Sequence, residues 1–516
     1  MKPKASFNLA THFLDRNVDE GRGERVALYC GESEVTYAEL CALTNRAGRV
    51  LQELGVGMGD RVLLALSDSA EFVACWFGAV KVGAVVAEAY TFLPVKDYRY
   101  YAQYTEARVV VVDTGTLAPM REAVADLAEA PRLLVVGDAQ LHPGETDFSA
   151  AAARMPADLE PAPTTPDDEA LWKFTTGSTG SPKAAVHRAY DPVVSFDSYA
   201  GEVLGYDESD RVLPVPKLFF GYARDMTARF TFGVGAAGIV FPERTTPERI
   251  FELIERRRPT ILVNVPTMMV QMLAHHGAER ADLSCLRCVV SSGEALPPEV
   301  HRRFVERFGV EVLEGIGSSE LYHIYVSNRP GRARVGSAGQ LVPGYEARIV
   351  VQEGDDLGDG APGELQVRGE SMASRYEGDE ERSSWTFGSG WVRTGDLFER
   401  DADGYLWYRG RVDDLLKVGG IWVAPLEIEH CLLAHPRVRE CAVVGHDENG
   451  LVFPLAFVVA AGDEDPERLA PELVRHVRGE LSPHKAPREV RFLEALPKTA
   501  NGKVDRKALS ESLTAP

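Results

Sequence analysis

Long hydrophobic runs are absent from this sequence, and cysteine is sparse. The longest apolar stretch, residues 72–90, is interrupted by Lys81 and Glu88, so it predicts a buried helix leading into a strand rather than a membrane span. The first residues hold no apolar core long enough for a signal peptide. The chain has 7 scattered cysteines in 516 residues, and the CxxC of Cys285 and Cys288 is followed by no second ligand pair. We therefore expect reduced thiols and a cytoplasmic protein.

An excess of positive charge is missing as well. The 56 lysines and arginines are outnumbered by 77 aspartates and glutamates, which gives a formal net charge of −21. The acidic residues are scattered rather than gathered in a tail, a distribution that argues against a nucleic-acid or anionic-membrane surface. We expect neither nucleic acid nor membrane as a partner, and either a monomer or a homodimer.

The pattern of apolar residues predicts an α/β protein of more than one domain. A chain of 516 residues exceeds what one core supports. Residues 24–165 alternate β-branched runs with helical spacing, which indicates βα units around mainly parallel sheets. Short strands and Gly/Asp turns make 345–410 β-rich. We predict a large N-terminal domain of βα-type sheets with a β-rich subdomain at 1–410, a hinge at 411–414 and a small, mobile α+β C-terminal domain at 415–516.

The segment FTTGSTGSPKAAVH, residues 174–187, is rich in hydroxyls and glycine around one lysine. A Walker A loop needs a glycine where this chain has Pro182, and a serine or threonine where Ala184 follows Lys183. Glycines that let backbone N–H groups approach an anion, together with hydroxyl and ammonium donors, still suit a polyanion. The segment therefore indicates an anion-binding loop of another kind, with a plain polar linker as the alternative.

Further motifs follow this segment in order: SSGEALP (291–297), EGIGSSE (314–320), RTGDL (393–397), GRVDDLLKVGGIWVAPLEIE (410–429) and PKTANGKVDRKAL (497–509). Together they resemble, over essentially the whole chain, the acyl-adenylate-forming superfamily. The stretches GSTGSPK, PKLFFGYARD and EGIGSSELYHIYVSN are similar to those of benzoate-CoA ligases and related aryl-acid:CoA ligases. The resemblance implies an enzyme that uses ATP, Mg²⁺ and coenzyme A.

The activity implied by this resemblance is acid–thiol ligation. ATP would adenylate an aromatic carboxylic acid, benzoate or a hydroxy- or aminobenzoate such as salicylate or anthranilate, and the acyl group would pass to coenzyme A with release of AMP and diphosphate. A freestanding ligase that loads a carrier protein is the alternative within enzymes. A nucleotide-binding protein that has lost catalysis is the alternative outside them.

The resemblance also assigns roles to individual residues of this sequence. The catalytic group comprises Lys503, Glu320 and Lys183, with Glu320 as the metal ligand. The ATP-binding group comprises Thr175, Thr176, Gly177, Ser178, Thr179, Gly180, Lys183, Ser292, Gly293, Glu294, Glu314, Gly315, Ile316, Gly317, Ser318, Ser319, Asp396 and Arg411. The acid pocket comprises Lys217, Phe219, Phe220, Gly221, Tyr222, Gly315 and His323. The hinge and CoA-binding group comprises Asp413, Lys417, Gly419, Gly420 and Trp422.

Two departures from the family pattern bear on the substrate. Ala223, Arg224 and Asp225 stand where a small, glycine-rich run is usual. This charged pair could serve a hydroxyl or amino substituent on the ring, or could pair with itself. Ile316 stands where many members stack an aromatic side chain on adenine, so we expect reduced stacking with binding retained. We expect His187 to be structural rather than an acid–base group.

Overall fold

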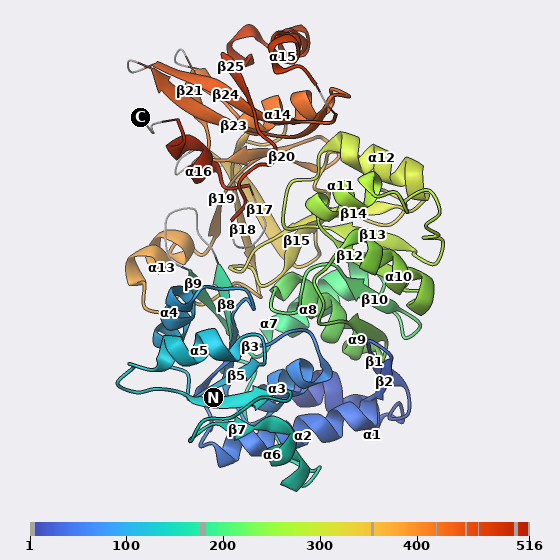
Figure 1. Cartoon of the computed structure of the whole chain (residues 1–516), viewed down its shortest axis with the longest axis vertical. Helices are drawn as coiled ribbons and strands as arrows, with labels where there is room; N and C mark the ends of the chain where they lie inside the picture. Colours follow the sequence, from blue (N-terminus) through green and yellow to red (C-terminus); the bar gives the residue numbers. More distant parts are fainter. Residues whose placement is uncertain are drawn as a thin grey trace.

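The structure is a computed structural model that describes residues 6–175, 182–351, 356–418, 421–448, 451–462, 464–499 and 504–513. Two large sheets and the helices around them form the lower part of the molecule in Figure 1, and the C-terminal elements lie at the opposite end. The chain reaches that end through a smaller antiparallel sheet.

The first sheet is parallel except for its last pair of strands, β8 and β9, which are antiparallel. Its order is β7 (Thr146–Asp147), β6 (Arg132–Val136), β5 (Val109–Asp113), β3 (Arg61–Ala65), β4 (Val85–Glu88), β8 (Glu169–Thr175) and β9 (Lys183–Arg188). One face packs on α2 (Tyr37–Glu53), α3 (Ala70–Lys81) and α6 (Phe148–Arg154). The other face packs on α4 (Val95–Thr105) and α5 (Leu117–Val124). Val62 and Leu64 face the first group and Leu63 and Ala65 the second, as strand alternation requires.

The second sheet has a parallel centre and antiparallel edges. Its order is β16 (Gln340–Leu341), β15 (Ile324–Ser327), β14 (Val312–Gly317), β13 (Cys288–Ser291), β12 (Ile261–Asn264), β10 (Arg211–Pro214), β11 (Ala237–Val240), β1 (Val26–Cys30) and β2 (Ser33–Thr36). On one face lie α10 (Pro247–Arg257), α11 (Pro266–Ala274) and α12 (Pro298–Phe308). On the other lie α8 (Gly221–Ala228), α9 (Phe230–Val234) and the π-helix Phe196–Val203 that continues α7 (Asp191–Ser195). Near the N-terminus, the π-helical turn Thr11–Asp15 runs into α1 (Arg16–Asp19).

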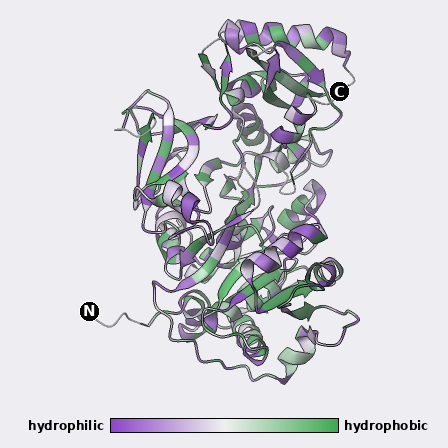
Figure 2. Cartoon of the chain, turned by 90° about the vertical axis from the view of Figure 1, so that its left-hand side faces the viewer, coloured by the Kyte–Doolittle hydropathy of each residue, from purple (hydrophilic) through white to green (hydrophobic). Residues whose placement is uncertain are grey.

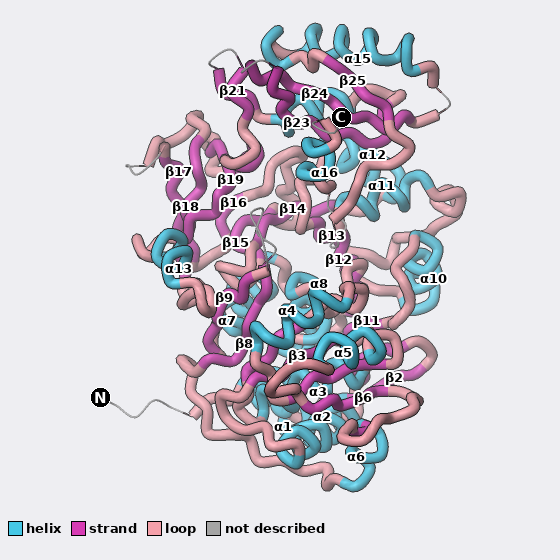
Figure 3. The backbone as a smooth tube through the Cα atoms, turned by 60° about the vertical axis from the view of Figure 1, so that its left-hand side comes forward, coloured by secondary structure: helices cyan, strands magenta, loops and turns pink. Residues whose placement is uncertain are grey.

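An antiparallel sheet and a smaller unit complete the fold. The antiparallel sheet contains β17 (Tyr345–Val350), β18 (Gly363–Gly369), β19 (Val392–Arg400) and β20 (Leu406–Arg411), with α13 (Glu380–Phe387) between β18 and β19. The C-terminal strands are β21 (Leu416–Val418) paired with β22 (Ile421–Val423), and a sheet of β23 (Val438–Glu448), β24 (Leu451–Ala460) and β25 (Glu489–Phe492). This sheet packs on α14 (Pro425–Leu433) and α15 (Pro466–Glu480) on one face and on α16 (Arg506–Glu511) on the other. A 3₁₀ turn, Pro483–Lys485, follows α15. The sheet of β23, β24 and β25 stands apart from the two large sheets when the molecule is turned (Figure 3).

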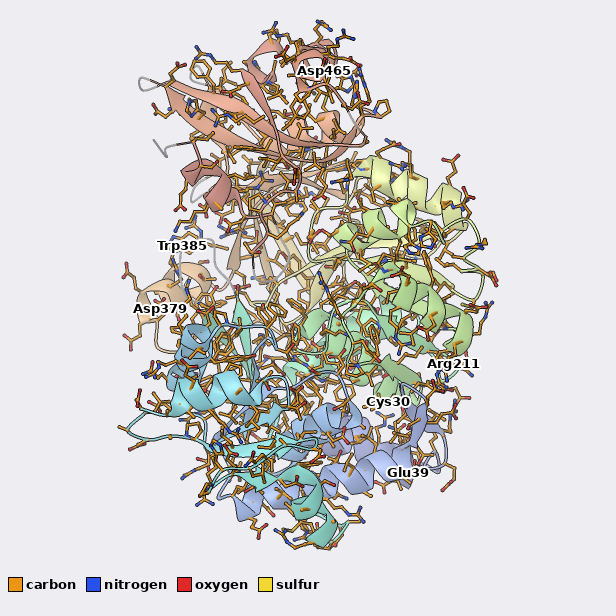
Figure 4. All side chains as sticks on the ribbon, viewed as in Figure 1. Cys30, Glu39, Arg211, Asp379, Trp385 and Asp465 are labelled. Atoms are coloured by element: carbon orange, nitrogen blue, oxygen red, sulfur yellow. The ribbon has the colours of Figure 1, made fainter. Side chains whose placement is uncertain are left out.

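Local sequence signals set where several helices begin. Thr36 and Glu39 form a capping box at the start of α2. Asp379 accepts a hydrogen bond from the N–H of Arg382 at the start of α13, and Asp465 caps α15. Glu39, Asp379 and Asp465 lie at these helix starts in Figure 4. Such caps satisfy N–H groups that have no partner within the helix.

The predicted fold class is confirmed. The chain has large, mainly parallel sheets in its N-terminal part and a separate small α+β unit at the C-terminal end. Figure 2 shows hydrophobic colour concentrated along the strands of the large sheets, while the outer helices alternate between hydrophilic and hydrophobic residues. Within the described residues, no helix combines the length and the apolar character that crossing a membrane requires.

Candidate functional site

The predicted nucleotide segments meet beyond the ends of β8 and β14. Ser319, in the turn after β14, donates a hydrogen bond from its hydroxyl to the carbonyl of Phe174 on β8 (3.3 Å). The N–H of Leu296 donates to Glu314 Oε1 (3.1 Å), which ties the segment after β13 to β14. Three motifs distant in sequence thus share one edge of the fold, where α/β sheets commonly bind ligands.

The two ends of the anion-binding segment are described. Thr175 and Lys183 are the last paired residues of the β8–β9 hairpin, one on each side of the connection between the two strands. The Lys183 ammonium lies 5.2 Å from the centre of the Tyr376 ring. The predicted phosphate contacts of Thr176, Gly177, Ser178, Thr179 and Gly180 lie outside the described residues.

Tyr376 joins this lysine to the predicted metal ligand. Its hydroxyl donates to Glu320 Oε1 at 2.7 Å, and the N–H of Ala373 donates to the Glu320 carbonyl at 2.8 Å. Tyr376 also bridges to Ala185 on β9. Lys183, Tyr376 and Glu320 therefore form a row beside the anion-binding segment. Tyr376 belongs to no motif, and the sequence carried no signal that would have identified it.

Glu320 fits a magnesium ligand by its donor chemistry. The parts of the chain that the structure describes contain no cluster of three or more His, Cys, Asp or Glu that could hold a metal ion by themselves. Mg²⁺ commonly takes one or two carboxylates and completes its shell with water and substrate phosphates. Glu320 supplies one carboxylate beside Lys183, which suits a Mg²⁺ ion that is held jointly by the protein and by the phosphates of a substrate.

The predicted adenine-binding segments hold an unusual carboxyl group. Burial raises the pKa of Glu314 to about 8, although a hydrogen bond from the Leu296 N–H acts in the opposite direction. Glu294 accepts from the Thr267 hydroxyl at 2.8 Å, while Ser292 is buried and Gly293 has a φ of 90°. The segment 292–296 is thus anchored to α11 through Glu294 and to β14 through Leu296.

The predicted ATP-binding residues Gly315 and Ile316 follow Glu314 on β14, and Ser318 comes directly after the strand. A Cβ on Gly315 would lie 3.1 Å from the carbonyl oxygen of Val326, so the neighbouring strand β15 leaves little room there. Ile316 packs against the core on the α8 side of the second sheet. Ser318 is half-buried and opens the turn that carries Ser319 and Glu320.

The predicted ribose-binding pair is formed across two strands. Asp396 on β19 is paired in register with Arg411 on β20, and Arg411 Nη1 donates to Asp396 Oδ1 at 3.1 Å. The same nitrogen donates to the Thr394 carbonyl at 2.9 Å. Arg411 Nη2 also lies 3.9 Å from a carboxylate oxygen of the predicted hinge residue Asp413. The guanidinium thereby fixes the orientation of the Asp396 carboxylate.

Two of the predicted pocket residues come together between α8 and the turn after β14. The rings of Tyr222 and His323 lie 6.0 Å apart, and the His323 ring lies 5.0 Å from Phe230. The Tyr222 hydroxyl donates to the carbonyl of Val290 at 3.0 Å. Burial lowers the pKa of His323 to about 4, so its imidazole is neutral at pH 7.

The other predicted pocket residues have different surroundings. Phe219 and Phe220 pack against the ring of Tyr90, with ring centres 5.2 and 4.9 Å away. The Lys217 ammonium donates to the Phe241 carbonyl at 2.7 Å and lies 3.9 Å from Asp68, a different set of contacts from those of Tyr222. Burial lowers the pKa of Lys217 to about 8. Lys217 in the acid pocket stays a prediction that these contacts do not support.

Arg224 and Asp225 turn inward, which decides between the two interpretations of this charged pair. Arg224 pairs with Glu88 on β4, and Asp225 pairs with Arg229 at 2.6 Å and with Lys173 at 2.9 Å. All of these side chains are nearly fully buried. The charges therefore pair among themselves. His187 is likewise structural: it is fully buried, and its ring nitrogens contact Asp191 and the Ser319 carbonyl.

The predicted hinge and CoA residues lie at the junction with the C-terminal unit. The Lys417 ammonium lies 5.5 Å from the ring of Trp422, which is 60% exposed. Gly419, Gly420 and Lys503 lie outside the described residues. Lys498 and Val504 form a β-bridge, so the two ends of the segment that contains Lys503 are held together.

Comparisons with known proteins agree over the full length. The AMP-binding enzyme family matches residues 14–377, and the AMP-binding enzyme C-terminal domain matches residues 427–503. A benzoate–CoA ligase of Thauera aromatica is 39% identical over 504 residues, covering 97% of this chain and 95% of its own. A 4-hydroxybenzoate–CoA/benzoate–CoA ligase of Rhodopseudomonas palustris is 38% identical, covering 99% and 95%. The crystal structure of the anthranilate CoA ligase AuaEII in complex with anthranoyl-AMP superposes with a TM-score of 0.94 at 36% identity, covering 99% of this chain and 98% of that one. The chain belongs to the AMP-binding enzyme family.

Proposed function

We propose that the chain is an ATP-dependent aryl-acid:CoA ligase. It adenylates benzoate or a small hydroxy- or amino-substituted benzoate and then transfers the acyl group to coenzyme A. The observation that carries this proposal is the row of Lys183, Tyr376 and Glu320, with the Ser319 hydroxyl bonded to Phe174 beside it. The Lys183 ammonium, the Glu320 carboxylate and the Ser319 hydroxyl are thereby brought together near the two ends of the anion-binding segment, at Phe174 and Lys183.

The chemistry requires positioning and charge neutralisation more than covalent catalysis. The carboxylate of the acid attacks the α-phosphate of ATP, and an acyl-adenylate and pyrophosphate result. Mg²⁺ held at Glu320 would offset the charge of the phosphate oxygens. Lys183 acts on the departing phosphates, Asp396 binds the ribose hydroxyls, and Lys503 acts near the acyl end. A thiol then attacks the acyl carbon, and AMP leaves.

The surroundings of Tyr222 and His323 support an aromatic acid. Tyr222 is half-buried and His323 is buried, and the fully buried rings of Phe230 and Tyr199 pack behind them, so a planar substrate would meet the ring of Tyr222 on an aromatic support. The neutral imidazole of His323 can hydrogen bond without adding charge. Because Arg224 and Asp225 are paired elsewhere, the pocket offers polar atoms but no charge from this pair, which favours hydroxyl or amino substituents over a second carboxylate.

Exchange of pyrophosphate with ATP and formation of a thioester test the proposal across a panel of benzoate, 2-, 3- and 4-hydroxybenzoate, 2-aminobenzoate, phthalate and two aliphatic acids. Each acid is assayed without a thiol, with coenzyme A and with a phosphopantetheinylated carrier protein. We expect acid-dependent exchange of pyrophosphate with ATP for the monocarboxylic aryl acids and thioester formation with coenzyme A. Activity confined to aliphatic acids would overturn the aryl assignment. Thioester formation on the carrier protein alone would overturn coenzyme A as the acceptor.

A further inference from the structure

A buried cluster of charge lies under the site, and one lysine in it connects three functional segments. The cluster comprises Glu88, Lys173, Arg224, Asp225 and Arg229, each at most 8% exposed. Lys173 lies on β8, directly before Phe174 and Thr175 at the base of the anion-binding segment. None of the motifs includes it.

The charges of this cluster do not require Lys173. Two arginines already face the two carboxylates: Arg224 pairs with Glu88, and Arg229 Nη1 lies 2.6 Å from Asp225 Oδ1. Lys173 adds a third cation, although burial lowers the pKa of its ammonium to about 8. Taking an ammonium out of water is costly, so a cation in excess of the local carboxylates needs a reason other than charge balance.

That reason lies in the turn that carries Ser319 and Glu320. Lys173 Nζ donates to the carbonyl oxygen of Tyr322 at 2.5 Å and lies 3.9 Å from the centre of its ring. Tyr322 has a φ of 74°, in the left-handed region that side-chain-bearing residues rarely adopt, and it is 1% exposed. Such a conformation persists only where its surroundings impose it.

Lys173 also reaches the helix that bears Tyr222. It pairs with Asp225 on α8 at 2.9 Å. A Cβ on Gly221, the first residue of α8, would lie 2.5 Å from Lys173 Cε and 2.7 Å from Nζ. The absence of a side chain at Gly221 therefore leaves the path of the lysine open. One ammonium joins the phosphate, metal and acid segments.

We propose that Lys173 is a positioning residue: by binding the Tyr322 carbonyl it fixes the turn 318–323, and with it Ser319 and Glu320, against the base of the anion-binding segment. The inference deepens the proposed ligase function and rests on it. It concerns the geometry of the site, because Lys173 is buried beneath the turn and acts on it through the contacts with Tyr322 and Asp225.

The test replaces Lys173 with methionine, which keeps an unbranched side chain, one bond shorter than lysine, and removes the donor. Two arginines and two carboxylates remain, so the charges of the cluster balance in the variant and the protein is expected to fold. We expect kcat for acid-dependent pyrophosphate exchange to fall about 10- to 100-fold, because small misplacements of reacting groups cost that much. The KM values for ATP and acid should stay within about 3-fold. Hydrogen exchange of the amides in 318–323 should become faster in the protein without substrates.

A matched control is Lys81→Met. Lys81 is also a buried lysine, 3% exposed and 2.7 Å from Asp15, but it lies on α3 away from the turn. This variant should lose thermal stability while kcat and the exchange of 318–323 stay at wild-type values. Should Lys173→Met not fold, Lys173→Gln supplies a neutral donor that is one bond shorter, and the same faster exchange with a smaller loss of kcat is expected.

Wild-type hydrogen exchange in 318–323 for a folded Lys173 variant would overturn the proposal, whatever its activity. So would a kcat loss that Lys81→Met reproduces. The proposed function has its own test: it fails if the wild-type enzyme shows no exchange of pyrophosphate with ATP in the presence of any aromatic acid. In that case the hydrogen-exchange comparison still tests the role of Lys173.

Discussion

At the scale of single residues, the predicted ATP-binding residue Glu314 makes the stability of the protein depend on pH. Its carboxyl is buried, and the folded-state pKa of about 8 exceeds the ordinary value of 4.5. Between these two pH values the native chain binds a proton that the unfolded chain releases. Stability therefore falls as pH rises through this window, by up to about 1.4 kcal/mol per pH unit.

Glu314→Gln removes this titration while keeping an acceptor for the Leu296 N–H. We expect the variant to match the wild type near pH 5 and to melt at a higher temperature than the wild type near pH 8. Calorimetry from pH 5 to 8 measures the difference. Glu306→Gln, an exposed position on α12, is the control and should show no such trend. A difference between Glu314→Gln and the wild type that is the same at every pH would contradict the raised pKa of Glu314.

At the scale of elements, the sequence predicts what depends on local patterns and misses what depends on distant partners. The capped start of α2 and the alternation of β3 follow from neighbouring residues, so the α/β class is readable. Lys173 and Tyr322 are 149 residues apart, and Tyr376 lies 56 residues from Glu320. No spacing rule connects such pairs. The sequence left the partner of Arg224 open for the same reason, because Arg224 lies on α8 and its partner Glu88 lies on the distant strand β4.

The turn between β14 and β15 gives an element-scale prediction. A Cβ on Gly317 would lie 2.5 Å from the carbonyl oxygen of His323 and 2.8 Å from its carbonyl carbon, and backbone cannot yield as a side-chain end can. Gly317→Ala should therefore displace the turn and lower kcat for pyrophosphate exchange about 10- to 100-fold.

Gly479→Ala is the matched control for that change. No atom lies within 4 Å of a Cβ built at Gly479 on α15, once the backbone of its own helix is set aside. Alanine should stabilise the helix by about 0.5–1 kcal/mol and leave kcat unchanged. Wild-type kcat in Gly317→Ala would show that the turn tolerates displacement.

At the scale of the whole molecule, Arg506 connects the C-terminal unit to the predicted hinge. It binds Glu429 through two bonds of 2.6 and 2.8 Å and the Val443 carbonyl at 2.9 Å, and it lies 3.8 Å from Asp414. A small cavity beside it is lined by residues of β20 and of the C-terminal unit: Tyr408, Gly410, Arg411, Asp414, Pro425, Leu426 and Arg506. The contact between Arg506 and Asp414 therefore ties the C-terminal unit to the end of the predicted hinge, and we expect it to stabilise the described arrangement of the two units.

Asp414→Asn weakens that contact without disturbing the buried pair of Arg506 and Glu429. The anthranoyl-AMP complex superposes with a TM-score of 0.94 over 99% of this chain, so the described arrangement of the two units is similar to the one in that complex. We expect pyrophosphate exchange to slow about 2- to 5-fold, the worth of a partly exposed ion pair, while CoA-dependent release of AMP from preformed acyl-adenylate is not slowed. Asp403→Asn removes an exposed contact with Arg334 instead, and both rates should stay at wild-type values. Equal slowing of both half-reactions in Asp414→Asn would mean that Arg506 and Asp414 stabilise the fold rather than one arrangement of the two units.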